Sequence, residues 1–202
     1  MMSELFTDYK VWFGVAAALL AVLNYLPYLI GSIKKTKQPH IFTWSLWFIL
    51  TSVAFAAQIL SGGGSGAWAT GITAAIIFLI TISALRSGFG YVRLFDWLAL
   101  AGALIAILIW AITNDPFWSV ILVSGIHSLC FLPTFRKGYH DPYHESVLAF
   151  VLTILKYGCA IVALNVYMVE TVLFPATIMT TSTLFITMIL LRRQILIESA
   201  HQ

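Results

Sequence analysis

Seven apolar runs follow one another along the chain, and each has about the length of a membrane-spanning helix. A helix needs about 20 predominantly apolar residues to cross the roughly 30 Å of hydrocarbon in a bilayer. The runs cover approximately residues 11–33, 41–60, 67–85, 95–113, 117–135, 145–164 and 170–191. Short connectors that carry most of the charge or glycine separate them. The pattern predicts an all-α membrane protein with seven transmembrane helices.

The composition excludes several other classes of protein. Only 9% of the 202 residues are charged and 60% are hydrophobic, whereas soluble domains average about 25% charged residues. The 11 basic and 8 acidic residues make no phosphate-binding surface, so we expect no nucleic-acid partner. Cys130 and Cys159 lie inside apolar runs, which argues against a disulfide framework. The first apolar run is too long for a signal-peptide core, so we expect it to be retained.

The basic residues predict the orientation of the chain in the membrane. With seven spans, nine of them fall on one face, namely Lys34, Lys35, Lys37, Arg86, Arg93, Arg136, Lys137, Arg192 and Arg193. The opposite face has only Lys10, and Lys156 lies within a span. Because lysine and arginine are enriched in cytoplasmic loops, we expect the N-terminus outside and the C-terminus in the cytoplasm. The expected location is the bacterial inner (plasma) membrane.

Two stretches of the chain resemble each other and indicate an internal repeat. The first span ends with LPYLIGSIKKTKQPHIFTWS and the fifth with LPTFRKGYHDPYHESV. In both, Leu-Pro is followed by a basic pair, a second proline and a hydroxyl residue four positions later. The repeat predicts two parallel three-helix bundles, residues 1–88 and 114–202, joined by a linker helix in 89–113. A single linker helix is needed because a unit of three helices ends on the opposite side of the membrane from where it begins. The linker returns the chain to the starting side, so that the second unit has the same orientation as the first.

This arrangement resembles the PQ-loop superfamily, which includes the SWEET sugar transporters, lysosomal amino-acid exporters and the KDEL receptor. The resemblance covers nearly the whole chain, but Tyr28 follows Pro27 and Thr134 follows Pro133, so the Pro-Gln dipeptide of that superfamily is absent. It implies that Pro27 and Pro133 act as hinges between transport states. The segments PHIFTWSLW and FLPTFRKGYHDPYHE also resemble a bacterial family, and that second resemblance implies no activity.

Polar side chains inside the predicted spans are the candidates for a binding site, because such groups are costly at membrane depth. Lys156 lies 11 residues after Glu145, or about 16 Å along the span. It would bind an anionic or carbonyl-bearing solute or serve as a proton-coupled site, or it would be a structural lysine bonded to helix-end carbonyls or one that snorkels towards the membrane surface. His127 on the fifth span could exchange a proton near neutral pH or bond to a neighbouring helix. Asn24 and Tyr25 could face the same cavity, although Asn24 could equally link two helices.

Further candidates lie near the ends of the spans. The basic residues Lys34, Lys35, Arg136 and Lys137 could gate an inner mouth, or they could be ordinary cytoplasmic charges. Trp44 and Trp47 could stack on a ring or anchor the bilayer interface. SGGGSG, at 61–66, is expected to be a flexible outer turn.

These observations favour a facilitated or proton-coupled transporter for a small polar solute. A membrane receptor that binds a ligand without moving it is the alternative, and the Trp-x-x-Trp spacing also resembles the nicotinamide riboside transporters. All eight acids lie at or outside the span ends and no HExxH motif occurs, so we expect neither enzymatic activity nor a metal or cofactor. The expected partners are the solute and the lipid bilayer, and association into a homo-oligomer is left open.

Overall fold

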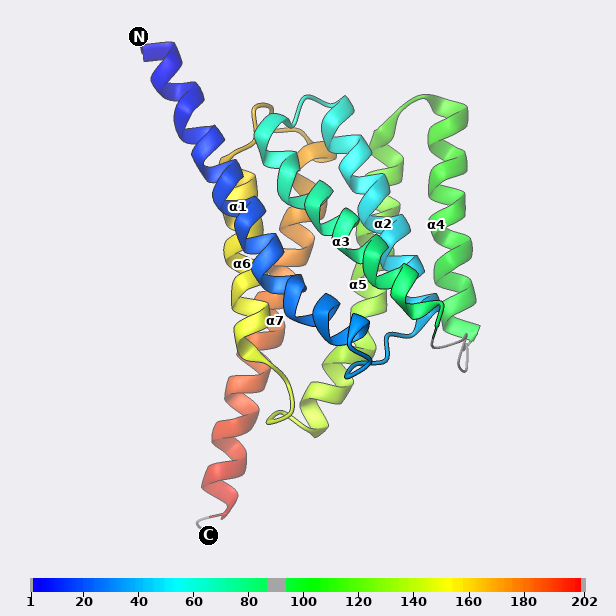
Figure 1. The fold of residues 1–202 in the computed structure, drawn as a ribbon, viewed down its shortest axis with the longest axis vertical. Coiled ribbons are helices and arrows are strands. Elements are labelled where there is room, and N and C mark those ends of the chain that lie inside the picture. Colours follow the sequence, from blue (N-terminus) through cyan, green and yellow to red (C-terminus); the bar gives the residue numbers. More distant parts are fainter. Residues whose placement is uncertain (1, 87–93, 201–202) are drawn as a thin grey trace.

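The computed structural model describes residues 2–86 and 94–200, which form seven α-helices and one short 3₁₀ helix (Figure 1). The elements are α1 (Met2–Ile33), α2 (Ile41–Leu60), η1 (Gly64–Ala67), α3 (Trp68–Ala84), α4 (Leu94–Thr113), α5 (Pro116–His140), α6 (Val147–Val162) and α7 (Val169–Ala200). The described part of the chain is therefore all-α, as expected. Arg93 and the expected boundary at residues 88–89 lie outside the described residues.

Five of the described helices are long and apolar enough to cross a bilayer by length and composition: α1, α2, the η1–α3 segment, α5 and α7. The two others are shorter apolar helices, Trp97–Thr113 within α4 and α6 with 16 residues. At 1.5 Å per residue, α6 is about 24 Å long, slightly less than the hydrocarbon thickness. These features make the chain an integral membrane protein.

Two helices continue beyond the ends of their apolar runs. Helix α5 reaches His140 rather than residue 135, and α7 reaches Ala200 rather than residue 191. Hydropathy marks where a chain leaves the hydrocarbon, but a helix ends only where its hydrogen bonding ends. The start of α5 is well marked in the sequence, because Pro116 occupies the first turn and the Asp115 side chain accepts a hydrogen bond from the Phe117 N–H at 2.9 Å.

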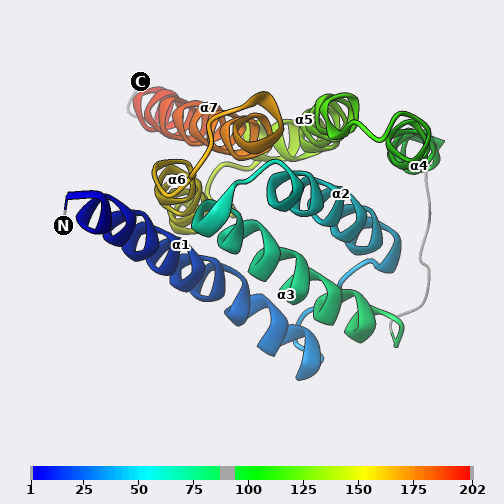
Figure 2. The same ribbon diagram turned by 90° about the horizontal axis from the view of Figure 1, so that it is seen from above.

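Six helices form a closed ring, seen from above in Figure 2. In the order α1, α3, α2, α5, α7, α6, each helix packs against the next, and α6 packs against α1. Helix α4 lies outside this ring and packs against α5 and α2. The helices alternate in direction, so α1, α3, α5 and α7 all begin at the end of the molecule where the N-terminus lies (Figure 1).

The helices approach closely because many of the buried positions carry small side chains. Fully buried alanines occur on five of the seven helices, and they are Ala17, Ala21, Ala54, Ala57, Ala69, Ala84, Ala103, Ala106 and Ala160, while α5 buries the small residues Val120 and Val123. Small residues are the usual interface residues of membrane helices, since van der Waals contact rather than the hydrophobic effect holds such helices together. Larger side chains surround a cavity at the centre of the ring.

Candidate functional site

A cavity of about 220 Å³ lies between the ring helices. It is lined by Tyr25, Thr43, Trp44, Trp47, Thr51, Thr73, Ile77, His127, Phe131, Phe150, Thr153, Tyr157, Ile178 and Ser182. All six ring helices contribute to this lining and α4 contributes none. Most of the lining residues occupy the middle of their helices, so the cavity lies at mid-depth. Such a mid-depth cavity between packed helices is where a ligand site is expected in a helical membrane protein.

His127 lines this cavity as an almost fully buried side chain with 5% exposure. Its ring packs edge-to-face against Trp47 at 4.5 Å and against Phe174 at 5.6 Å between ring centroids. Neither Nδ1 nor Nε2 has a hydrogen-bond partner in the described part of the protein. A buried polar atom without a partner costs about 1–3 kcal/mol. His127 therefore has an unmet capacity to bond a molecule in the cavity.

Lys156 is fully buried, so its side chain points into the protein rather than towards lipid. Its ammonium donates a hydrogen bond to Thr73 Oγ1 at 3.2 Å. It also lies over the Tyr157 ring at 4.2 Å and over the Tyr25 ring at 4.9 Å from the centroids. These three partners all line the cavity, whereas Lys156 itself does not. The two ring faces and the hydroxyl compensate the charge, and they lie between the ammonium and the cavity.

Asn24 and Tyr25 have different positions. Asn24 Nδ2 donates to Thr153 Oγ1 at 2.7 Å, which joins α1 to α6. Asn24 lines a second cavity of about 210 Å³, and Tyr25 lines both cavities. The second cavity is lined by Asn24, Tyr25, Tyr28, Trp44, Ala149, Phe150 and Thr153. The cavities share four of these residues, so they abut, and the second lies towards the helix ends that carry the basic residues.

Trp44 and Trp47 both line the central cavity. Trp44 also lines the second cavity, where its ring lies 4.7 Å from that of Tyr28. Both interpretations that the sequence left open, contact with a ligand and anchoring at the bilayer surface, stay predictions.

At the end where the N-terminus lies, hydrogen bonds tie α1 and η1 to the connector between α6 and α7. Lys10 Nζ donates to the Leu164 carbonyl at 2.7 Å. Ser65 Oγ lies 3.0 Å from the Lys10 carbonyl and 3.0 Å from the Ala163 carbonyl, and the Asn165 N–H donates to the Gly63 carbonyl at 3.2 Å. We call this group of contacts the N-terminal clasp.

The clasp differs from the flexible turn that SGGGSG led us to expect. Ser65, Gly66 and Ala67 form part of η1 and are buried. The contact is close because of a glycine on the facing helix: a Cβ at Gly14 would lie 2.7 Å from Ser65 Cβ. The glycines of this region therefore allow close packing as well as a turn. In the sequence, this close contact is indicated only by Gly14, within the first apolar run.

Pro27 and Pro133 lie inside α1 and α5, and both helices continue past them. A third proline, Pro175, lies inside α7 and was not singled out from the sequence. Proline has no N–H for the carbonyl four residues earlier, and for Pro175 that carbonyl belongs to Thr171. The buried Gln58 side chain of α2 donates to this oxygen at 2.9 Å. The expected hinge role of Pro27 and Pro133 stays a prediction.

The basic connectors are well-bonded turns. In the first, which follows α1, the Thr36 N–H donates to the Gly31 carbonyl and the Lys35 N–H donates to the Ser32 carbonyl. This pair of hydrogen bonds is a Schellman motif. Lys35 occupies its left-handed position with φ 59°, where glycine is usual. Lys34 precedes it in the same turn.

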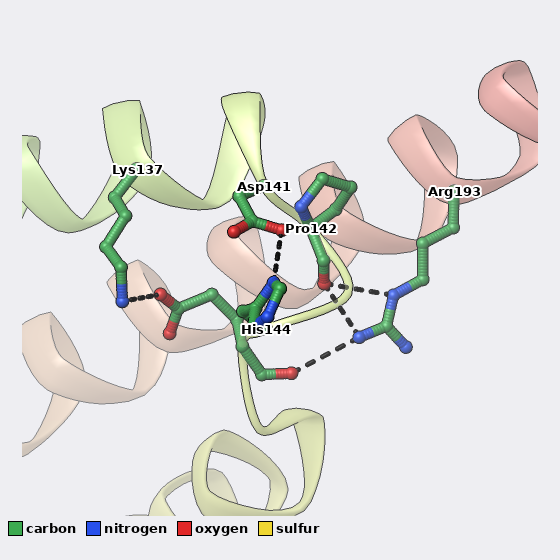
Figure 3. Close-up of polar contacts among 6 residues, drawn as sticks. Lys137, Asp141, Pro142, His144 and Arg193 are labelled. Carbon is green, nitrogen blue, oxygen red and sulfur yellow. Dashed lines mark hydrogen bonds and ion pairs between the residues drawn. The ribbon is translucent and has the colours of Figure 1, made fainter.

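The connector between α5 and α6 is held from two sides (Figure 3). Lys137 forms an ion pair with Glu145 at 2.8 Å, and His144 contacts Asp141 at 2.7 Å. The Arg193 guanidinium of α7 donates to the Pro142 carbonyl at 2.8 Å and to the Glu145 carbonyl at 3.2 Å. Arg136 precedes this network on α5. The gating role of Lys34, Lys35, Arg136 and Lys137 stays a prediction.

No family model, curated protein or solved structure matches this chain.

Proposed function

We propose that this chain is a membrane transporter for a small polar solute, in which two three-helix units rock about the central cavity. The first unit is α1–α3, the second is α5–α7, and α4 is the linker between them. As the resemblance to the PQ-loop superfamily implies, the two units would be parallel repeats.

The order of helices around the ring supports the repeat. The first unit contributes α1, α3 and α2 in that order, and the second contributes α5, α7 and α6. If α1, α2 and α3 are exchanged with α5, α6 and α7, the order of helices around the ring stays the same. The α1–α6 contact then corresponds to the α5–α2 contact. The position of α4 outside the ring agrees with a linker, because α4 contributes nothing to the cavity.

The main support for the proposal is that the hydrogen bonds between the two units differ between the N-terminal end and the basic end of the molecule. At the N-terminal end, the hydrogen bonds of Lys10 to Leu164, of Ser65 to Ala163 and of Gln58 to Thr171 join the first unit to the second. At the basic ends of the helices, the Ser32–Ser83 contact stays within the first unit, and the Lys137–Glu145 and Arg193–Pro142 contacts stay within the second. The Asn24–Thr153 hydrogen bond joins the two units, but it lies further along α1 and α6 from these ends.

This asymmetry suits one state of an alternating-access cycle. The second cavity abuts the central one on the side of the basic end, whereas the clasp joins the two units at the opposite end. If the basic end faces the cytoplasm of a bacterial cell, as the distribution of lysine and arginine favours, the state is the inward-facing one. Rocking of the units would open the clasp and bring the basic ends together.

Flux through reconstituted protein tests the proposal. Purified protein in liposomes is given a panel of radiolabelled small solutes of neutral, anionic and cationic classes, with empty liposomes and the His127→Phe variant as controls. We expect uptake of at least one solute that depends on the wild-type protein and is reduced in the variant. Solutes that stabilise the protein against heat without any flux would contradict transport and favour a receptor.

A further inference from the structure

The chemistry of the central cavity narrows the solute that it would take, an inference that rests on the proposed function. We propose that the cavity binds an uncharged, planar, single-ring molecule with an amide-type edge that bonds to His127. Size, charge, shape and hydrogen-bonding capacity each support one part of this description.

The size of the cavity limits the molecule to about one ring. A volume of about 220 Å³ corresponds to roughly seven water molecules at about 30 Å³ each. Drug-sized ligands occupy cavities of about 300–1,000 Å³. A molecule with a single six-membered ring and one small substituent fits this space, whereas a larger molecule would extend into the second cavity.

The lining of the cavity carries no carboxylate, ammonium or guanidinium among the described residues. An ion that entered would lose its hydration without finding a charged partner, which is costly. The nearest charge is the Lys156 ammonium, which disfavours a cation. An anion in the cavity would not meet the ammonium directly, because Thr73, Tyr25 and Tyr157 line the cavity beside it and Lys156 does not. The cavity therefore favours an uncharged molecule.

Flat surfaces dominate the lining. Trp44 and Trp47 from α2 face the same space as Phe131 from α5 and Phe150 from α6. Aromatic rings bind other planar rings best, through stacked or edge-to-face contacts. A saturated ring with axial hydrogens makes poorer contact with such faces, so the lining favours a planar solute.

His127 supplies the unmet polar contact. A neutral imidazole has one N–H donor and one acceptor nitrogen, and both nitrogens of His127 lack a partner. An amide edge has an N–H donor beside a carbonyl acceptor, so it can bond to a ring nitrogen of either tautomer once the imidazole turns that nitrogen towards the cavity. The binding of such an edge removes the cost of the unpaired histidine.

Thermal stabilisation of the purified full chain in detergent tests this inference with three matched probes. Benzamide has the planar ring and the amide, benzoate replaces the amide by a charge, and cyclohexanecarboxamide keeps the amide on a saturated ring. Uracil and its carboxylated form, orotate, repeat the comparison of charge with a ring amide. We expect a concentration-dependent rise in melting temperature of several degrees with benzamide or uracil, and at least a tenfold weaker effect with each counterpart.

Two variants connect the effect to the cavity. His127→Phe keeps an aromatic ring against Trp47 and should abolish the shift. Trp44→Leu should weaken it at least tenfold and serves if His127→Phe does not fold. Trp118→Phe, at a position 54% exposed and away from both cavities, should bind like the wild type.

The inference is overturned if neither benzamide nor uracil stabilises the protein, if benzoate or cyclohexanecarboxamide matches benzamide, or if His127→Phe binds like the wild type. Binding in detergent involves no flux, so this result is separate from the transport test. Binding without flux rejects transport alone, whereas flux of a charged or non-planar solute rejects the solute class alone.

Discussion

The Gln58 side chain of α2 donates a hydrogen bond to the Thr171 carbonyl of α7, and this carbonyl is the one that Pro175 leaves without its helical partner. Gln58 and Thr171 are both fully buried. A polar residue in one unit thus satisfies a backbone defect in the other, at the end where the clasp lies.

This relationship predicts a specific double-mutant cycle. Gln58→Leu should lower the free energy of unfolding by about 1–3 kcal/mol, because it leaves the buried Thr171 carbonyl unpaired. In a Pro175→Ala background the restored N–H can bond to that carbonyl, so Gln58→Leu should cost clearly less. Denaturant or thermal unfolding of the four proteins measures the coupling. Equal costs in the two backgrounds would show that the two features are independent.

A second prediction concerns Lys156 and Thr73. Lys156→Met should leave the protein folded and about as stable, because none of the carboxylates in the described part of the chain pairs with Lys156 and would be left buried. Thr73→Val should cost more, about 1–3 kcal/mol, because it removes a partner while the ammonium stays buried. Melting temperatures of the two variants provide the comparison. A larger loss for Lys156→Met would mean that the ammonium is a structural anchor.

A third prediction uses two glycines as a matched pair. Gly14→Ala should destabilise the protein by about 1–3 kcal/mol, because the new methyl group would lie 2.7 Å from Ser65 Cβ in the clasp. Gly125→Ala on α5 has nothing within 4 Å of the new methyl, so it should be neutral or stabilise by up to about 1 kcal/mol. Thermal unfolding distinguishes the two variants. If both changes had a similar effect on stability, Gly14 would not be in close contact with Ser65.

The hinge role of the prolines predicts a separation of flux from binding. Pro27→Ala and Pro133→Ala each restore a helical hydrogen bond, which should stiffen α1 or α5 and slow the change between states. We expect flux in proteoliposomes to fall severalfold while solute affinity in detergent changes less than twofold. Equal losses of both, or loss of folded protein, would identify the prolines as plain structural kinks.

Hydropathy and charge predicted the number of helices, their approximate bounds and their alternation, because these depend on the exchange of water for hydrocarbon along one chain. Of the polar residues that the sequence places within the spans, His127 and Tyr25 line the central cavity and Asn24 lines its neighbour, whereas Lys156 lines neither; their role in binding a solute stays a prediction.

What could not be predicted depends on contacts between distant segments. The sequence cannot say that Lys156 lies behind Tyr25 and Tyr157, because this depends on how α6 is rotated against α1. The burial of Ser65 in the clasp depends on the facing Gly14. Gln58 offered a signal that was overlooked: a lone amide near the end of an apolar run needs a partner.

In a protein with alternating access, the clasp becomes accessible to water in one state and is closed in the other. Cys130 and Cys159 are first replaced by alanine, and a single cysteine is then introduced as Ser65→Cys, at a position that is 6% exposed. Labelling by a membrane-impermeant thiol reagent is measured in proteoliposomes with and without a transported solute. The control is Ser119→Cys, fully buried where α5 meets α4.

We predict that labelling of Ser65→Cys changes severalfold when the solute is added, while Ser119→Cys stays protected. Opening of the clasp in the outward-facing state should expose position 65 but not position 119. Equal protection of both positions under all conditions, together with measurable solute binding, would contradict rocking of the two units.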